Sequence, residues 1–106
     1  MEPQLIYITT GSQEEAEHIG RALVEERLAA CANILPQHLA MYWWEGRVQE
    51  DYEVLVIAKT RKELVDALVA RVRTLHSYTC PCVVALPISG GFDEYLRWVY
   101  RETREP

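Results

Sequence analysis

The stretch Ala30–Thr60, ACANILPQHLAMYWWEGRVQEDYEVLVIAKT, predicts a long β-hairpin and decides the fold. Only Glu45-Gly46 separates its two extended runs, and glycine readily adopts the positive φ that a two-residue hairpin turn requires. The turn fixes the expected pairs, which are Trp44 with Arg47, Trp43 with Val48 and Ala40 with Asp51. The same register can extend back to Cys31 opposite Thr60.

One strand and one helix are predicted before the hairpin. Leu5–Thr10 is a β-branched and aromatic run that stops at Gly11, as a strand does. Ser12 and Glu15 have the spacing of a capping box. Apolar residues then recur at helical spacing, so we expect a helix over about Gln13–Leu28.

A helix, a strand and a short final helix are predicted after the hairpin. Thr60 and Glu63 form a second capping box before an apolar helical stripe that ends at Leu75. Cys82–Ile88 favours a strand whose Pro87 suits an edge, and Phe92–Arg101 has helical spacing again.

The order strand, helix, strand, strand, helix, strand is typical of a ferredoxin-like sheet with both long helices on one face. The predicted class is therefore α+β, a ferredoxin-like sandwich with a long β-hairpin and an extra C-terminal helix. The 106 residues suffice for one core, and we expect residues 1–106 to form a single domain.

The hairpin is too long for a monomer of this size. An arm of fourteen residues, Arg47–Thr60, spans roughly 46 Å, whereas a compact chain of this length has a radius of gyration of about 13 Å. The overhanging tip carries an aromatic cluster, and apolar clusters of this kind mark contact surfaces; its members are Met41, Tyr42, Trp43 and Trp44.

Both faces of the second hairpin strand are also apolar. Val54 and Val56 alternate with Leu55 and Ile57, although two helices cover only one face of such a sheet. We therefore expect a homo-oligomer that is closed by the second face and the hairpin tip.

Composition argues against two classes of partner, nucleic acids and membranes. A net charge of -5, a pI near 5.2 and scattered basic residues lack the electrostatic footprint of a nucleic-acid-binding protein. No secretory or membrane-spanning pattern is found, so we expect a soluble cytoplasmic protein without membrane contacts. The three cysteines lack the spacing of a disulfide framework, and in the reducing cytoplasm they would be free thiols.

Motifs along nearly the whole chain resemble the CutA family of divalent-cation-tolerance proteins. They occur in the order and spacing of that family, and together they are specific. They are ALVEERLAACANI (22–34), YWWEG (42–46), KT (59–60), LHSYTCP (75–81), ALPI (85–88) and YLRW (95–98).

The resemblance implies a ferredoxin-like protomer and a homotrimer similar to the PII signalling proteins. It also implies a cytoplasmic role in tolerance of copper, as Cu(I) or Cu(II), or of another divalent metal, and no established enzyme activity. By position, Cys31 matches the family cysteine for which copper ligation has been proposed. Tyr42, Trp44 and Gly46 match the hairpin-tip motif, so Gly46 joins the expected oligomer interface.

One segment departs from the family pattern. Where the family usually reads HPYEVPE, this chain reads HSYTCPC (76–82), so Cys82 stands in place of a common glutamate. On a strand, Cys80 and Cys82 would point to the same side. Three interpretations stay open, namely buried packing, a disulfide, which strand geometry strains, and a soft-metal site.

A metal site could draw on further residues. His76 could add an imidazole to the two thiols, although a histidine there also suits the negative end of the preceding helix. Cys31 should lie on the opposite sheet edge, about 14 Å away, so it could join Cys80 and Cys82 only across subunits. His18 and His38 are interpreted as surface residues.

Three other function classes compete with metal tolerance. The chain has no nucleophile elbow, phosphate-binding glycine loop or helical zinc motif, which argues against an enzyme. The acidic residues near the hairpin, Glu45, Glu50, Asp51 and Glu53, are interpreted as a solvated edge. A PII-like trimer that binds a small molecule between its subunits, or a scaffolding trimer, are the alternatives.

Overall fold

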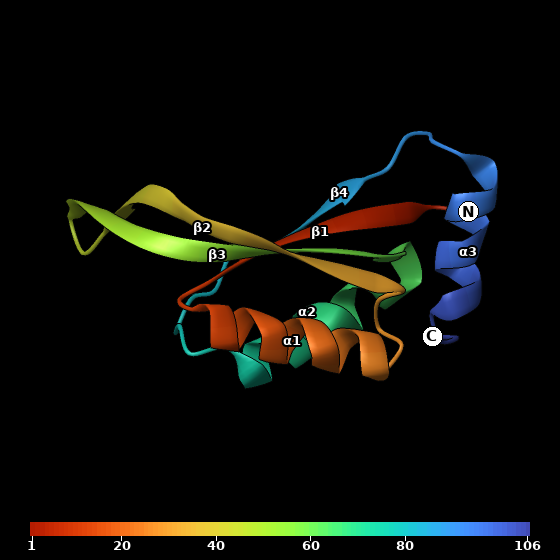
Figure 1. Cartoon of the computed structure of the whole chain (residues 1–106), viewed down its shortest axis with the longest axis horizontal. Coiled ribbons are helices and arrows are strands. Elements are labelled where there is room, and N and C mark those ends of the chain that lie inside the picture. The colour runs from red at the N-terminus through yellow and green to blue at the C-terminus, as the bar shows by residue number, and fades with distance from the viewer.

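The hairpin is the longest feature of the computed structural model, which describes all residues 1–106. Strands β2 (Cys31–Trp44) and β3 (Arg47–Arg61) form it, and its tip extends beyond the rest of the molecule (Figure 1). The molecule measures 43 × 25 × 23 Å, so its long axis is set by the hairpin. The predicted overhang is confirmed.

The predicted pairs next to the turn are confirmed. Trp44 pairs with Arg47, and Ala40 pairs with Asp51. Both turn residues, Glu45 and Gly46, have positive φ, at 51° and 76°, as a type I′ turn requires.

The predicted register at the far end of the hairpin was wrong by one residue, because a β-bulge interrupts the ladder between Leu35 and His38. Cys31 therefore pairs with Lys59 and not with Thr60. Pro36 lies in the bulge, and proline, which cannot donate to a ladder, is confined to such positions in a sheet.

The sheet contains two further strands, β1 (Pro3–Thr10) and β4 (Val83–Pro87). Its order is β2-β3-β1-β4, and all neighbours are antiparallel. Helices α1 (Gln13–Glu25) and α2 (Val65–Leu75) cover one face, whereas α3 (Asp93–Glu102) lies at the end opposite the hairpin tip (Figure 1). The predicted α+β class and element order are confirmed. No helix combines the length and the apolar composition needed to cross a bilayer.

Helix α1 begins as predicted and ends earlier than predicted. The Ser12 hydroxyl accepts the Glu15 backbone N–H at 3.1 Å. The helix stops at Glu25, and not near Leu28, because Arg27 adopts a left-handed φ of 57°. The Leu28 N–H then bonds to the Leu23 carbonyl at 2.9 Å, which completes a Schellman motif.

The second predicted capping box was wrong. Strand β3 continues to Arg61, and a short 3-10 turn, η1 (Lys62–Leu64), separates it from α2. The Thr60 hydroxyl donates instead to the Leu28 carbonyl at 2.6 Å. Thr60 thus bonds to a residue that is distant in the sequence and does not cap the following helix.

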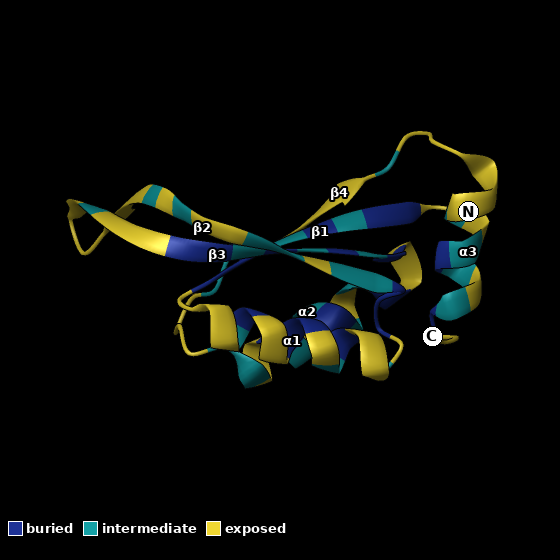
Figure 2. Cartoon of the chain, in the orientation of Figure 1, coloured by how far each residue is buried: buried dark blue, intermediate teal, exposed yellow.

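The core lies between the helices and one face of the sheet (Figure 2). Ile6, Ile8 and Val56 are fully buried there, and α1 and α2 contribute Ile19 and Leu68. Arg61 ties α3 to this body, because its Nε donates to the Thr103 hydroxyl at 2.9 Å.

The opposite face of the sheet carries no helix. Register and strand alternation place seven apolar side chains on it, which we call the open face; they are Leu5, Tyr7, Leu35, Leu55, Ile57, Val84 and Leu86. The first five are half-buried and the two on β4 are exposed. The expectation that both faces of β3 are apolar is confirmed.

Candidate functional site

A groove of about 630 Å³ extends along the open face, from Tyr7 and Glu53 at the base of the hairpin to Trp44 at its tip. Strands β1, β2 and β3 and the loop between α2 and β4 line it, so it depends on the tertiary fold. Five of the residues that line it are aromatic, namely Tyr7, Tyr42, Trp43, Trp44 and Tyr78. The hairpin cluster expected to form an oligomer interface thus also forms one wall of this groove.

A carboxylate lies in the groove. Glu53 is only 7% exposed, and the Tyr78 hydroxyl donates to its Oε2 at 2.8 Å. Burial, together with this hydrogen bond, raises the pKa of Tyr78 strongly. The interpretation of Glu53 as part of a solvated edge was wrong, because Tyr78 from the loop covers it.

Tyr42 is held in a similar way from the other wall. Its hydroxyl donates to Asp51 Oδ2 at 2.6 Å, across the two strands of the hairpin. This hydrogen bond raises the pKa of Tyr42 above its usual value. Both phenols are therefore fixed by carboxylates at their hydroxyl ends.

Glu15 anchors the loop that carries Tyr78. Its two carboxylate oxygens accept the backbone N–H groups of Gly11 at 3.0 Å and Ser77 at 2.7 Å. Partial burial alone would raise the pKa of Glu15, but these hydrogen bonds outweigh it and lower the pKa. The start of α1 thus positions one wall of the groove.

His76 also positions this loop. Its side chain is fully buried, with Nε2 2.7 Å from the Thr9 carbonyl. The Tyr78 backbone N–H donates to Nδ1 at 3.1 Å, so Nε2 must carry the proton and donate to Thr9. Both ring nitrogens are engaged, and neither is free to bind a metal in this arrangement.

Cys80 and Cys82 both line the groove, but not from a strand. Strand β4 begins only at Val83, after Pro81, so the same-side argument from strand alternation was wrong. Cys80 is exposed and Cys82 is half-buried, which excludes buried packing of the pair in the single chain. Burial raises the pKa of the Cys82 thiol.

Cys31 lies far from this pair, as predicted from the strand order. It begins β2, at one edge of the sheet, whereas Cys80 and Cys82 precede β4 at the other. Its Sγ is 3.4 Å from the Tyr95 hydroxyl, and this contact raises the pKa of Tyr95 to about 12. No group of three or more His, Cys, Asp or Glu side chains could hold a metal within one chain.

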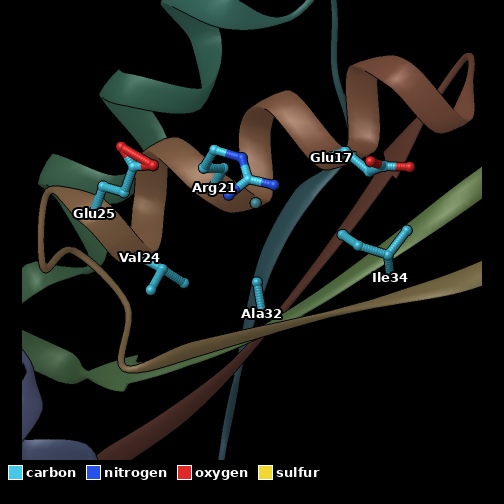
Figure 3. Close-up of a pocket in the computed structure, with 7 residues that line it drawn as sticks. Glu17, Arg21, Val24, Glu25, Ala32 and Ile34 are labelled. Carbon is cyan, nitrogen blue, oxygen red and sulfur yellow. The ribbon is translucent and has the colours of Figure 1, made fainter.

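A second, smaller hollow of about 240 Å³ lies between α1 and the edge strand β2 (Figure 3). Glu17, Arg21 and Glu25 project from the helix above Ala32 and Ile34 of the strand. None of the predicted site residues lines it. The larger groove is therefore the candidate site.

Sequence reasoning missed Tyr7, Glu53 and Tyr78 as groove residues. One signal was present for Glu53, because it shares strand parity with Leu55 and Ile57, which lie on the open face. No pattern in the sequence shows that Tyr78 folds over this position, since 25 residues separate the two.

The chain has known relatives. A family model described as the CutA1 divalent ion tolerance protein matches residues 4–102. The chain is 48% identical to the divalent-cation tolerance protein CutA of Thermus thermophilus, over 94% of this chain and 97% of that protein. It is 46% identical to the chloroplastic protein CutA 1 of Oryza sativa over 95% of its length, but spans only 57% of that protein.

Solved structures agree with the sequence matches. The crystal structure of CutA1 from Oryza sativa superimposes with a TM-score of 0.96 at 43% identity, covering 100% of this chain and 97% of that one. The Thermus thermophilus protein gives a TM-score of 0.94 at 47% identity, covering 96% and 99% of the two chains.

Proposed function

Since the chain belongs to the CutA1 divalent ion tolerance protein family, we propose that it is a homotrimeric metal-tolerance protein that binds a soft metal ion in the groove. Copper is the proposed metal, and the protein would bind other metal ions, including divalent ones, more weakly. The protein would be a binding module and not an enzyme.

The observation that carries this proposal is the position of two thiols. Cys80 and Cys82 line one groove from a single loop, with only Pro81 between them. Thiolates select Cu(I) and zinc over hard cations, and two sulfurs at one opening can converge on one ion. The raised pKa of Cys82 disfavours its free thiolate, so metal binding would have to release a proton.

The remaining predicted ligands have different prospects. His76 would need to give up the hydrogen bond at one ring nitrogen, either from the Tyr78 N–H to Nδ1 or from Nε2 to the Thr9 carbonyl, before it could coordinate a metal. Cys31 could join only from a neighbouring subunit, with the β2 edge of one chain beside the β4 edge of the next. Such edge pairing would also satisfy exposed backbone groups.

Two surfaces support the oligomer. The hairpin tip exposes Trp43 by 75%, and Met41 and Trp44 are exposed beside it. The open face adds half-buried Leu55 and Ile57 and exposed Leu86. Exposed clusters of apolar side chains are typical of a contact surface between subunits. Sedimentation equilibrium should give the mass of three chains.

The metal proposal is tested by an anaerobic Cu(I) competition titration of the reduced protein. The double variant Cys80→Ser/Cys82→Ser should lose tight binding, whereas a Tyr52→Phe control should retain it. Cys31→Ser reports on the shared site, since an unchanged stoichiometry would exclude it. Equal affinity of the double variant and the wild type would overturn the proposal.

A small-molecule-binding, PII-like trimer is the second candidate, and the groove itself favours it. A volume of about 630 Å³ and a mostly apolar lining fall within the range of small-molecule sites. Calorimetric titration with nucleotides and metabolites would test this candidate, and saturable binding without copper would support it.

The proposed compartment is the cytoplasm, because thiols must stay reduced to bind Cu(I). Immunodetection in cell fractions tests the compartment. Recovery of the protein outside the cytoplasmic fraction would contradict the proposal.

A further inference from the structure

We infer that, in the proposed homotrimer, Lys59 of the partner subunit is the counter-ion of Glu53. The inference rests on the proposed function, whose trimer it requires, and it adds a residue of a second chain to the groove. It requires neither a bound metal nor a free opening of the groove, because both groups would lie in the contact between subunits.

Glu53 has no cation in its own chain. It is 7% exposed, and its one side-chain hydrogen bond comes from the Tyr78 hydroxyl. None of the six ion pairs of the chain includes Glu53, although His38 faces it across the two hairpin strands. No lysine or arginine lines the groove. A buried carboxylate without a cation is costly, and covering the open face with another subunit removes still more of its water.

Lys59 has the complementary charge and the same lack of a partner. It shares strand parity with Glu53 on β3 and therefore lies on the open face. It is half-buried, and its Nζ donates to Asn33 Oδ1 at 2.6 Å without forming an ion pair. Its neighbours on the adjacent strands are Leu5 and Cys31. A subunit that covers this face would leave the ammonium without an anion, unless it supplies one.

Two other cations of β3 share this parity. Arg61 is already held by the end of α3, because it donates to the Thr103 hydroxyl and lies 3.6 Å from Glu105. Arg47 makes no ion pair, but it is exposed beside the hairpin turn, where water can solvate it. Lys59 is therefore the cation that most needs an anion when the open face is covered.

Glu53 and Lys59 cannot meet within one chain. They lie six positions apart on β3, which corresponds to about 20 Å at the rise of a β-strand. In a cyclic trimer, each contact joins two different patches of successive copies. The Lys59 region of one copy can therefore lie on the Glu53 region of the next, and the symmetry repeats this pair at all three contacts.

The pair also bears on the metal site. Cys31 faces Lys59 across β2 and β3, and facing side chains of such a ladder have Cβ atoms about 4.5–5.5 Å apart. A contact between Lys59 and Glu53 would bring Cys31 of the partner subunit close to the groove that Cys80 and Cys82 line. The ion pair would thus position the third thiol that a shared site requires.

The test mixes two variants of the full-length, reduced, copper-free protein. Glu53→Lys places two cations at each contact, and Lys59→Glu places two carboxylates there. Each variant alone should raise the dissociation constant of the trimer at least about tenfold, as measured by sedimentation. An equimolar mixture should recover trimers, because unlike chains present opposite charges to each other. Native mass spectrometry should show both variants in these trimers.

Two further sets of variants control the experiment. Arg47→Glu replaces the rival cation, and its mixture with Glu53→Lys should not recover mixed trimers. If circular dichroism shows that Glu53→Lys does not fold, the uncharged variants Glu53→Gln and Lys59→Met are compared instead. Their double variant should weaken the trimer about as much as either single variant, because each change alone already breaks the pair.

The outcomes separate this inference from the proposed function. Wild-type trimer stability in both charged variants, no gain on mixing them, or additive effects of Glu53→Gln and Lys59→Met would overturn the inference alone. A monomeric wild-type protein would overturn the proposed trimer, and the inference with it. A failed copper titration would leave the mixing result unchanged, because the mixing experiment contains no metal.

Discussion

The Tyr78 hydroxyl donates a 2.8 Å hydrogen bond to Glu53, and this contact joins the loop before β4 to the hairpin. It buries a carboxylate in the groove that also holds Cys80 and Cys82. One side-chain pair thus shapes the candidate site and links its two walls. The site can be perturbed through Tyr78 without changing a thiol.

Tyr78→Phe should destabilise the fold by about 1–3 kcal/mol, because it leaves a buried carboxylate oxygen without its donor. Urea unfolding measures the loss. Tyr52→Phe is the matched control, since Tyr52 is 62% exposed and should change stability little. A Tyr78→Phe protein as stable as that control would show that the hydrogen bond contributes nothing.

Tyr95 should titrate near pH 12, because its hydroxyl contacts Cys31 Sγ at 3.4 Å. Its pKa in the fold lies above the value of 10.0 for an ordinary tyrosine, so its contribution to stability is complete below pH 10 and is lost as the pH rises towards 12. Cys31→Ala should move the titration towards pH 10, as followed by tyrosinate absorbance. No movement in that variant would exclude the contact as the cause.

Gly46→Ala should destabilise the protein by about 1–2 kcal/mol, because φ is 76° at this position and a side chain is strained there. Gly90→Ala is the control, because an added Cβ meets no atom within 4 Å and φ at Gly90 is not positive. Thermal unfolding of the two variants compares them directly. Equal melting temperatures would contradict a left-handed Gly46.

Trp43→Glu should dissociate the proposed trimer, because it places a charge at the hairpin tip, where the side chain is 75% exposed in the single chain. Phe92→Glu is the control, since Phe92 is 72% exposed but precedes α3 at the other end of the molecule (Figure 1). Sedimentation velocity distinguishes the species. A Trp43→Glu protein with the wild-type mass would remove the tip from the interface.

Much of the fold follows from local chemistry that the sequence carries. Glu45-Gly46 fixes the hairpin turn, and Ser12 fixes the start of α1, because each acts on its immediate neighbours. Errors arose where a distant group competed with a local one. Thr60 bonds to Leu28 and not within its own helix.

The candidate site was less predictable, since it depends on contacts between distant segments. The sequence indicated Cys80 and Cys82 as candidate ligands, but it wrongly placed them on a strand. Strand β4 starts after them, because pairing with β1 begins only at Val83 opposite Ile8. The burial of Glu53 depends on Tyr78, and the 3-10 turn η1 and helix α2 separate these two residues in the sequence. Sequence patterns describe residues that are close along the chain, and they do not reveal contacts between distant segments.

X-ray absorption spectroscopy at the copper edge of the Cu(I)-loaded, reduced protein tests the proposed function most directly, because it identifies the atoms bound to the metal. We expect a first shell of sulfur alone, with two sulfur atoms, or three if Cys31 of a neighbouring subunit takes part. The shell should be lost in Cys80→Ser/Cys82→Ser. A first shell dominated by nitrogen or oxygen, or one unchanged in that variant, would contradict metal binding by the cysteine pair.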